Sequence, residues 1–253
     1  MKPRTLLLAL LLACAASRAS AKELRVLFVG NSFVYVNDLP GTFAKIAAAQ
    51  GDHAVVESYA PGGANFEGHL RDPRVRRAIE SKTWDFVVLQ EQSQRPSFDE
   101  PQVAQEVIAP GLELDKLVRA SHEGTRTAFY ETWGRKDGDA SNCKNTPNVC
   151  TYAGMQLRIT QTYAELARKT GAALAPVGRA WAMVRRAHPD LELYGGDGIH
   201  PSERGTYLAA CVFYATLFGK SPAGAPKLGL SADDADRLQQ AAVVAALEPA
   251  VSK

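Results

Sequence analysis

The sequence predicts an α/β fold, a three-layer α/β/α arrangement with a mostly parallel sheet of about five strands between two layers of helices. Short apolar runs rich in valine, phenylalanine and tyrosine alternate with longer segments of helical periodicity. This alternation continues across most of the chain, which favours successive β-α-β units. No repeat, linker or low-complexity segment interrupts it, so residues 22–253 are expected to form one domain.

Five strands are expected, each a short apolar run: LRVLFVG (24–30), HAVVESYA (53–60), DFVVLQ (85–90), RTAFYETW (126–133) and AALAPVG (172–178). Helical patterns separate them over 41–51, 66–82, 103–121 and 152–171. The last of these ends at Gly171, a frequent helix terminator. Beyond residue 200 only helices are expected. The final one covers 231–249, and Ser231 and the acidic residues after it mark its start.

The first 21 residues have the pattern of a secretory signal peptide. Lys2 and Arg4 precede an apolar run at 6–16, and Ala19-Ser20-Ala21 is an A-x-A cleavage site. A competing interpretation takes Leu11-Leu12-Ala13-Cys14 as a lipoprotein box with Cys14 lipidated. Either one predicts an exported protein, periplasmic or secreted. No later stretch is long enough to cross a membrane as a helix.

The charge balance gives no sign of a nucleic-acid partner. The formal net charge of the chain is +2. Removing 1–21 takes away Lys2, Arg4 and Arg18 and leaves 26 of the 29 basic residues against 27 acidic ones, a balance near −1. No basic tract remains that would bind a phosphate backbone.

The cysteines fit an oxidising compartment. Cys143 and Cys150 flank the polar loop CKNTPNVC and are expected to form a disulfide there. A metal site is the weaker interpretation, because no second Cys or His pair lies nearby at ligand spacing, and no metal is expected. Cys211 lies in the apolar run YLAACVFYATLF and is expected to be a buried free thiol.

A serine follows the first expected strand, in GNSF. In parallel sheets, ligands bind outside the carboxyl ends of the strands, and Ser32 lies just past such an end. The alternative is that Asn31 and Ser32 only cap the helix near residue 40. A serine hydroxyl is a weak nucleophile unless a base activates it, so the chemistry depends on a histidine.

The segment GGDGIHPSERG offers that base. Asp197 and His200 are three residues apart, and Pro201 holds His200 extended. The carboxylate can then face Nδ1 of the imidazole and leave Nε2 free to take the Ser32 proton. The alternative is an aspartate in a glycine turn and a histidine near a helix start.

The other histidines are weaker candidates. His69 follows the glycine-rich turn in APGGANFEGHL, where it would line the site or lie on a helix surface. The remaining three are expected to be solvated: His53, His122 and His188.

Two further segments suit an acyl-transfer site, which needs donors for a developing oxyanion. PGGAN (61–65) follows the second strand with unshielded backbone N–H groups, and LQEQSQ (89–94) follows the third with three glutamines. Together with GNSF and the Asp-x-x-His segment, they are expected at one edge of the sheet.

In these four segments the chain resembles the SGNH hydrolases, also called GDSL-type esterases. The matching features are GNSF, a glycine after the second strand, an amide-rich segment after the third, and Asp-x-x-His near the C-terminus, over about 24–220. The resemblance implies a flavodoxin-like fold and hydrolysis of esters, thioesters or acetylated carbohydrates, without metal or cofactor.

By this resemblance Ser32 corresponds to the nucleophile, and Asp197 and His200 complete the triad. The backbone N–H of Ser32 and that of Gly63 correspond to oxyanion donors. The family's third block normally reads Gly-x-Asn-Asp, whereas this chain has QEQSQ, which resembles the carbohydrate-esterase branch. The candidates for a side-chain donor are therefore Gln90 first, with Gln94 and Gln92 as alternatives.

The substrate is expected to be an acylated small molecule or an acetylated polysaccharide. The long polar loop 131–152 follows the fourth strand, where such loops often set specificity. Asn31, Trp133 and His69 are expected to line the site, and Tyr152 is a further candidate for stacking on sugars, whereas Trp181 is expected in the core.

The favoured function is a carbohydrate O-acetyl esterase. Alternatives are a lysophospholipase or thioesterase, and a non-catalytic glycan-binding protein on the same fold. A nucleotide-binding protein is disfavoured because the first turn lacks a phosphate-binding loop.

Overall fold

The computed structural model describes residues 21–248. Apart from Ala21, the predicted signal peptide, with its alternative lipidation site at Cys14, lies outside these described residues. So does residue 249, the last of the predicted C-terminal helix.

Five parallel strands form one sheet in the order β2-β1-β3-β4-β5, which confirms the predicted α/β class. This is the flavodoxin-like order, in which the chain reverses direction across the sheet between β1 and β3. The strands are β1 (Glu23–Val29), β2 (His53–Tyr59), β3 (Phe86–Leu89), β4 (Arg126–Tyr130) and β5 (Ala173–Ala175).

The neighbouring strands β2, β1 and β3 end at the same level. Val29 of β1 is paired with Tyr59 of β2 and with Leu89 of β3. The residues that follow these strands therefore meet at one edge of the sheet. All four residues of β3 are buried, as expected of a strand covered on both faces.

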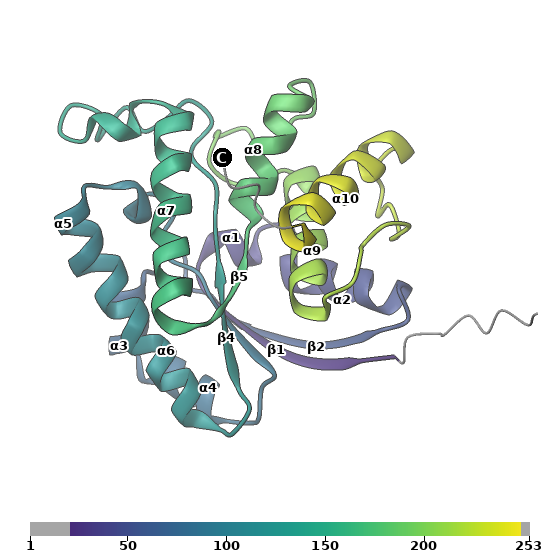
Figure 1. The fold of residues 1–253 in the computed structure, drawn as a ribbon, viewed down its shortest axis with the longest axis horizontal. Helices are drawn as coiled ribbons and strands as arrows, with labels where there is room; N and C mark the ends of the chain where they lie inside the picture. The colour runs from purple at the N-terminus through teal and green to yellow at the C-terminus, as the bar shows by residue number, and fades with distance from the viewer. Residues whose placement is uncertain (1–20, 249–253) are drawn as a thin grey trace, which may run out of the picture.

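Helices cover both faces of the sheet, as Figure 1 shows. Alternate β1 side chains point to opposite layers, with Val26 and Phe28 in one core and Leu27 and Val29 in the other. One layer contains α2 (Leu39–Ala49), α8 (Val177–Ala187), α9 (Glu203–Phe218) and α10 (Ala232–Leu247). The other contains α3 (Phe66–Arg71), α4 (Pro73–Glu80), α6 (Ala109–Ser121) and α7 (Tyr152–Thr170).

Two expected helices are interrupted at prolines. The segment 66–82 divides at Asp72, which is extended because a residue before proline is disfavoured in helical geometry. Its carboxylate then caps α4 by accepting from the Arg74 N–H at 2.9 Å. The segment 103–121 consists of the end of α5 (Glu100–Val103), a π-helical turn (Ala104–Ile108) and α6, with Pro110 just after the turn.

The last two strands are shorter than the sequence predicted. β4 ends at Tyr130, so 131–133 leave the sheet, and β5 ends at Ala175, just before α8 begins at Val177. Three short helices were not anticipated: α1 (Ser32–Tyr35) and two 3-10 turns, Arg95–Ser97 and Pro147–Cys150.

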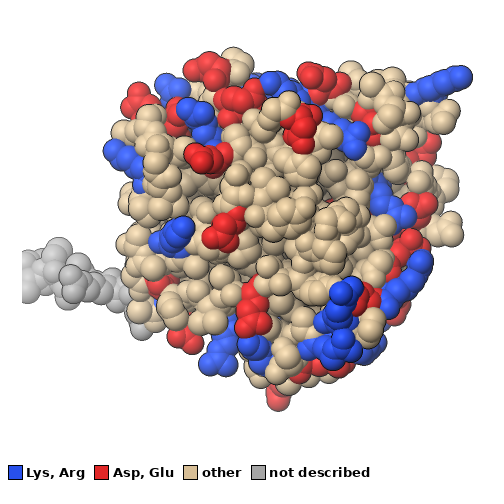
Figure 2. Space-filling view, turned by 180° about the vertical axis from the view of Figure 1, so that it is seen from behind, with Lys and Arg blue, Asp and Glu red and all other residues tan. Residues whose placement is uncertain are grey.

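One face of the molecule carries charges of both signs without a large block of either. Figure 2 shows Lys and Arg interspersed with Asp and Glu over one face of the molecule. None of the helices within residues 21–248 is long and apolar enough to span a membrane.

Candidate active site

Ser32 is the first residue of α1 and the third residue after the end of β1. Asn31 caps this short helix, since its side-chain oxygen accepts from the Phe33 N–H at 3.2 Å. The following helix α2 has its own cap, Asp38, which accepts from the Gly41 N–H at 3.1 Å. The alternative in which Asn31 and Ser32 serve only to cap the helix near residue 40 therefore does not describe this turn.

Ser32, His200 and Asp197 form a continuous hydrogen-bonded chain. The Ser32 Oγ lies 2.8 Å from His200 Nε2, and His200 Nδ1 lies 2.5 Å from Asp197 Oδ2. The carboxylate also accepts from the backbone N–H groups of Ile199 and His200, both at 2.9 Å. With a proton on Nδ1 facing the carboxylate, Nε2 is the acceptor for the serine hydroxyl.

The hydrogen bonds that Asp197 accepts keep its carboxylate ionised. Burial alone would raise the pKa of Asp197, but the His200 ring and the N–H groups of Ile199 and His200 lower it to about 2. The negative charge therefore faces the imidazole over the whole neutral range. A hydroxyl next to a base that a third group orients is the arrangement of an activated nucleophile.

The loop that carries Asp197 and His200 is held from two sides. Its own turn closes through the Gly195 N–H, which donates to the His200 carbonyl at 2.7 Å. From the β4 side, the Lys136 N–H donates to Gly198 O at 2.9 Å, and Trp133 Nε1 donates to Ile199 O at 3.1 Å. Gly198 has a φ of +67°, a conformation that glycine adopts without strain.

Trp133 does not line a substrate site, contrary to the sequence-based expectation. Its side chain is 1% exposed and lies in an aromatic stack, with ring centroids 4.6 Å from Phe33 and 3.8 Å from Trp181. Phe33 in turn meets the His200 ring edge to face at 5.6 Å. The stack therefore packs against the imidazole through Phe33. Trp181 is in the core, as expected.

Tyr152 is covered as well. The Arg185 guanidinium lies 3.9 Å from the centre of its ring, and its hydroxyl is buried. The buried Trp133 offers no face for stacking on a sugar, and Arg185 occupies one face of the half-buried Tyr152 ring.

Asn31 and His69 are buried, so the expectation that they line the site is also wrong. Both are 2% exposed. Asn31 Nδ2 donates to Ala64 O at 2.9 Å, which ties the Ser32 turn to the glycine turn after β2. Burial lowers the pKa of His69 to about 4, even though a hydrogen bond with the Gly30 backbone favours its charged form. His69 is therefore neutral and packs behind the turn.

Gln90 is not positioned to donate to an oxyanion, which corrects the first choice among the glutamines. It is fully buried, its Oε1 accepts from the Asn31 N–H at 2.9 Å, and its amide NH₂ donates to Glu91 O. A side chain at Gly30 would place its Cβ 2.5 Å from Gln90 Oε1. Glycine at this position is therefore required for the close approach of β3 to the Ser32 turn.

Gln92 and Gln94 are half-buried and shape the loop after β3. Gln92 Oε1 accepts from the N–H groups of Gln94 and Arg95, at 3.0 and 3.3 Å, and Gln94 Oε1 accepts from Arg135. Their amide NH₂ groups have no acceptor among the described residues. Both remain candidates for a side-chain donor, and no contact in the structure distinguishes them.

Two backbone donors are free at this edge. The Ser32 N–H, at the start of α1, has no helical acceptor. Gly63 is exposed in a turn closed by the Ala64 N–H donating to Pro61 O at 3.1 Å, and its own N–H has no acceptor within the described residues. Its φ of +70° favours glycine. These N–H groups can stabilise negative charge on a substrate oxygen.

Sequence reasoning missed a buried carboxyl beside the site. Glu91 accepts from the N–H groups of Phe66 at 2.9 Å and Gln92 at 2.6 Å, and burial raises its pKa to about 7. The only sequence signal was an acidic residue between two glutamines directly after a buried strand.

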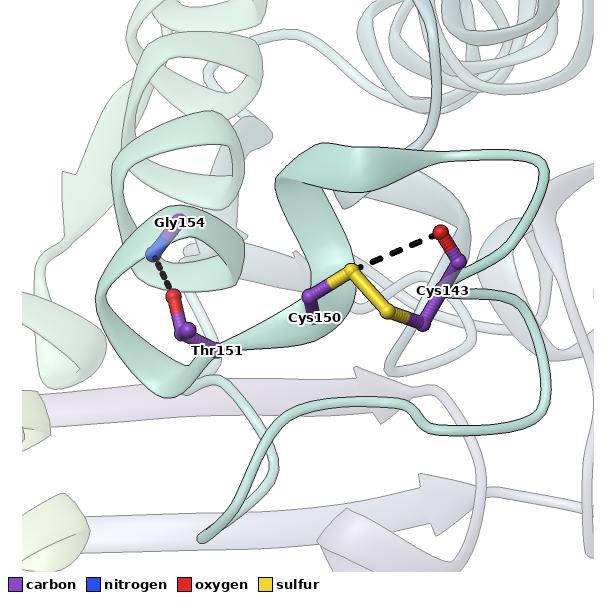
Figure 3. The surroundings of a disulfide bond; sticks show 4 residues. All are labelled: Cys143, Cys150, Thr151 and Gly154. Atoms are coloured by element: carbon purple, nitrogen blue, oxygen red, sulfur yellow. Dashed lines mark hydrogen bonds between the residues drawn. A yellow bond between two sulfur atoms is a disulfide. The ribbon is translucent and has the colours of Figure 1, made fainter.

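A disulfide joins Cys143 to Cys150 and closes the loop between them (Figure 3). Cys211 is a buried free cysteine. In the described range 21–248, no three His, Cys, Asp or Glu side chains come together as a potential metal site.

Comparison with solved structures relates this chain to hydrolases, although it matches no protein-family model and no curated protein sequence. A protein from Slackia heliotrinireducens described as an SGNH hydrolase is 32% identical, with a TM-score of 0.64 over 77% of this chain and 99% of that one.

Two more distant structures share the fold. A DUF4886 family protein from Bacteroides uniformis is 18% identical, with a TM-score of 0.75 over 90% of this chain and 96% of that one. A lipase/acylhydrolase from Enterococcus faecalis is 16% identical, with a TM-score of 0.53 over 77% and 93%.

Proposed function

This chain belongs to the SGNH hydrolase family, and from that premise we propose that it is an exported serine esterase that removes O-acetyl groups from carbohydrates. In this proposal Ser32 is the nucleophile, His200 the general base and Asp197 the residue that orients it. The observation that carries the proposal is the unbroken hydrogen-bond chain from Asp197 through His200 to Ser32.

The proposed reaction has two halves. Ser32 Oγ attacks the ester carbonyl carbon while its proton passes to His200 Nε2, and the oxyanion accepts from the Ser32 and Gly63 N–H groups. The carbon–oxygen bond to the alcohol then breaks as His200 returns the proton to the leaving oxygen. Water attacks the resulting acyl-enzyme with His200 again as base, which releases the acid and restores Ser32.

A small acyl group is supported by the scatter of the large hydrophobic side chains that are most exposed on the described residues. The exposed large hydrophobic side chains lie singly on different elements: Tyr35, Val55, Leu70, Leu157, Leu228 and Leu247. A long acyl chain would need a contiguous apolar path from the serine.

Export is supported by the sequence pattern of 1–21 and by the Cys143–Cys150 disulfide, a bond typical of oxidising compartments. An exported enzyme meets envelope or environmental polymers, which include acetylated polysaccharides.

The test is hydrolysis of p-nitrophenyl esters of increasing chain length by the wild type, Ser32→Ala and His200→Ala. We expect acetate to be preferred, and each variant to lose activity by roughly 10³-fold or more. His53→Ala, which removes an exposed histidine at the start of β2, is the matched control and should keep full activity.

Other outcomes would favour a different function or a different nucleophile. Preference for long chains would favour the lysophospholipase or thioesterase alternative. Labelling by a fluorophosphonate that persists in Ser32→Ala would exclude Ser32 as the nucleophile. Glycan binding without hydrolysis of any ester would favour the non-catalytic alternative.

A further inference from the structure

The side chain of Tyr35, in the same short helix as Ser32, is exposed to solvent. Of the eight tyrosines, all within the described residues, only Tyr35 is exposed, and its side chain is 53% accessible. Its hydroxyl makes no hydrogen bond to any described residue. A tyrosine whose ring and hydroxyl are both unused by the fold leaves both available to a ligand.

Tyr35 lies on the same side of α1 as Ser32. The two residues are three positions apart in the helix, a spacing that places side chains next to each other on one face. The ring also reaches the turn after β2, because a Cβ added to Gly62 would lie 3.3 Å from the Tyr35 hydroxyl. Tyr35 therefore borders both Ser32 and the turn that carries the Gly63 N–H.

The other aromatic residues near the site are less exposed than Tyr35. Phe33 and Trp133 are buried in the aromatic stack that contacts His200. The Arg185 guanidinium lies over the Tyr152 ring. Among the described residues, Tyr35 is thus the most exposed aromatic side chain beside the Ser32 hydroxyl.

We propose that the Tyr35 ring is a binding site for the sugar ring that carries the scissile ester. The proposal rests on the proposed carbohydrate esterase function and adds a recognition element to it. A pyranose ring has an apolar C–H face and hydroxyl groups at its edge. Tyrosine offers a matching apolar face and one hydroxyl that can donate or accept.

Binding can be measured without turnover in the Ser32→Ala protein. Titration calorimetry with an acetylated xylo-oligosaccharide should show about tenfold weaker binding when Tyr35→Ala is added. Tyr35→Phe, which keeps the ring, should lose only part of that affinity. Leu157→Ala is the matched control, because Leu157 is 60% exposed on α7. Equal affinity in the Ser32→Ala protein and its Tyr35→Ala derivative would overturn the proposal.

Turnover by enzyme that retains Ser32 gives an independent readout. Tyr35→Ala should lower kcat/KM for the acetylated oligosaccharide by about tenfold, chiefly through KM. Hydrolysis of ethyl acetate, which has no ring, should change by less than about twofold. An equal fall on both substrates would mean that Tyr35 acts on the catalytic geometry, and would overturn the proposed sugar site.

The two proposals fail differently. Cleavage of the acetylated oligosaccharide that is unaffected by Tyr35→Ala removes the Tyr35 site and leaves the esterase function. Cleavage of ethyl acetate by a protein that neither binds nor cleaves the acetylated sugar removes the carbohydrate substrate together with the Tyr35 site, and leaves a serine esterase.

Discussion

Two buried amide side chains hold three strand ends in a fixed relation at the candidate site. Gln90, after β3, accepts from the Asn31 N–H after β1, and the Asn31 side chain donates to Ala64 O after β2. These bonds set the distance between the Ser32 turn and the glycine turn that carries Gly63. The contribution of Gln90 is therefore to position backbone donors rather than to donate itself.

Substitutions at Gln90 separate these two roles. Gln90→Glu keeps an oxygen for the Asn31 N–H, and its carboxyl, protonated by burial, can still donate to Glu91 O. Gln90→Met leaves the Asn31 N–H unpaired and should destabilise the protein by about 1–3 kcal/mol. We expect Gln90→Glu to keep kcat within about tenfold at pH 6, and Gln90→Met to lose about 10²-fold. Equal losses of kcat would instead favour a direct oxyanion donor.

Asp197→Asn tests the orientation of His200. The amide cannot stabilise a positive imidazole as the ionised carboxylate does, so we expect kcat to fall by roughly 10³–10⁴-fold. Asp197 is 46% exposed on its side chain, so the thermal midpoint should change little. Thermal unfolding followed by circular dichroism is the control. A large loss of stability would mean that the loop itself had changed.

At the scale of elements, the disulfide loop braces the loop that carries His200. The disulfide closes the segment 143–150 (Figure 3). Within that segment the Val149 carbonyl accepts from the Asp139 N–H at 2.7 Å. A Cβ at Gly138 would lie 2.6 Å from Cys150 backbone atoms, so the backbone at Gly138 and the backbone at Cys150 are in close contact. Lys136, two residues earlier, donates to Gly198 O.

Removing the disulfide should loosen this brace. The double substitution Cys143→Ser/Cys150→Ser opens a short loop and should lower the free energy of unfolding by roughly 2–3 kcal/mol. We expect a lower thermal midpoint and a moderate fall in kcat. Reductant should reproduce the shift in wild type and have no effect on the double variant, because Cys211 is buried. An unchanged midpoint would show that the loop is held by its hydrogen bonds alone.

At the scale of the whole molecule, three buried ionisable groups couple stability to pH. Burial raises the pKa values of Glu91 and Glu131 to about 7, and burial lowers that of His69 to about 4. The folded state binds more protons than the unfolded state at the two glutamates between pH 4.5 and 7. At His69 it binds fewer between pH 4 and 6.5.

Stability should therefore fall as pH rises from 4.5 to 7. The stabilisation from each glutamate is complete below pH 4.5, the ordinary pKa of the group. It is lost as the pH rises to about 7, the pKa of the group in the folded state. Each contributes up to about 1.4 kcal/mol per pH unit. His69 opposes this trend until about pH 6.5.

Glu131→Gln should flatten the decline in urea unfolding at pH 5, 6, 7 and 8. Thr160 can still donate to the amide oxygen that replaces the carboxylate. Glu113→Gln, at an exposed carboxyl on α6, is the control and should keep the wild-type slope. A slope that Glu131→Gln leaves unchanged would remove Glu131 as a source of the pH dependence.

Much of this architecture could be predicted because its signals are local. Five apolar runs predicted the strands. Residues that follow strand ends in a parallel sheet share an edge, and the Ser32 turn is hydrogen-bonded there to the segments after β2 and β3. The His200 loop follows α8 instead of a strand, so this rule does not account for its contact with Ser32. The direction in which a side chain points could not be predicted from the residues next to it. Trp133 turns inward because β4 ends at Tyr130 and the chain enters the aromatic stack.

The choice among the glutamines was not predictable for the same reason. Gln90, Gln92 and Gln94 have one chemistry and similar spacing from the strand. Their roles depend on how the loop turns after Leu89, which is decided by contacts with Asn31 and Arg135 from distant parts of the chain.

The Ser32–His200 contact joins residues 168 positions apart, and it has a consequence for the order of folding. The β-strands and most of the helices precede His200 along the chain, whereas α9 and α10, which cover one face of the sheet, follow it. Closure of a contact this long comes late, because its entropic cost is met only after nearer contacts form. Hydrolytic competence thus marks complete folding, and a chain arrested before residue 200 would hold the serine without its partner.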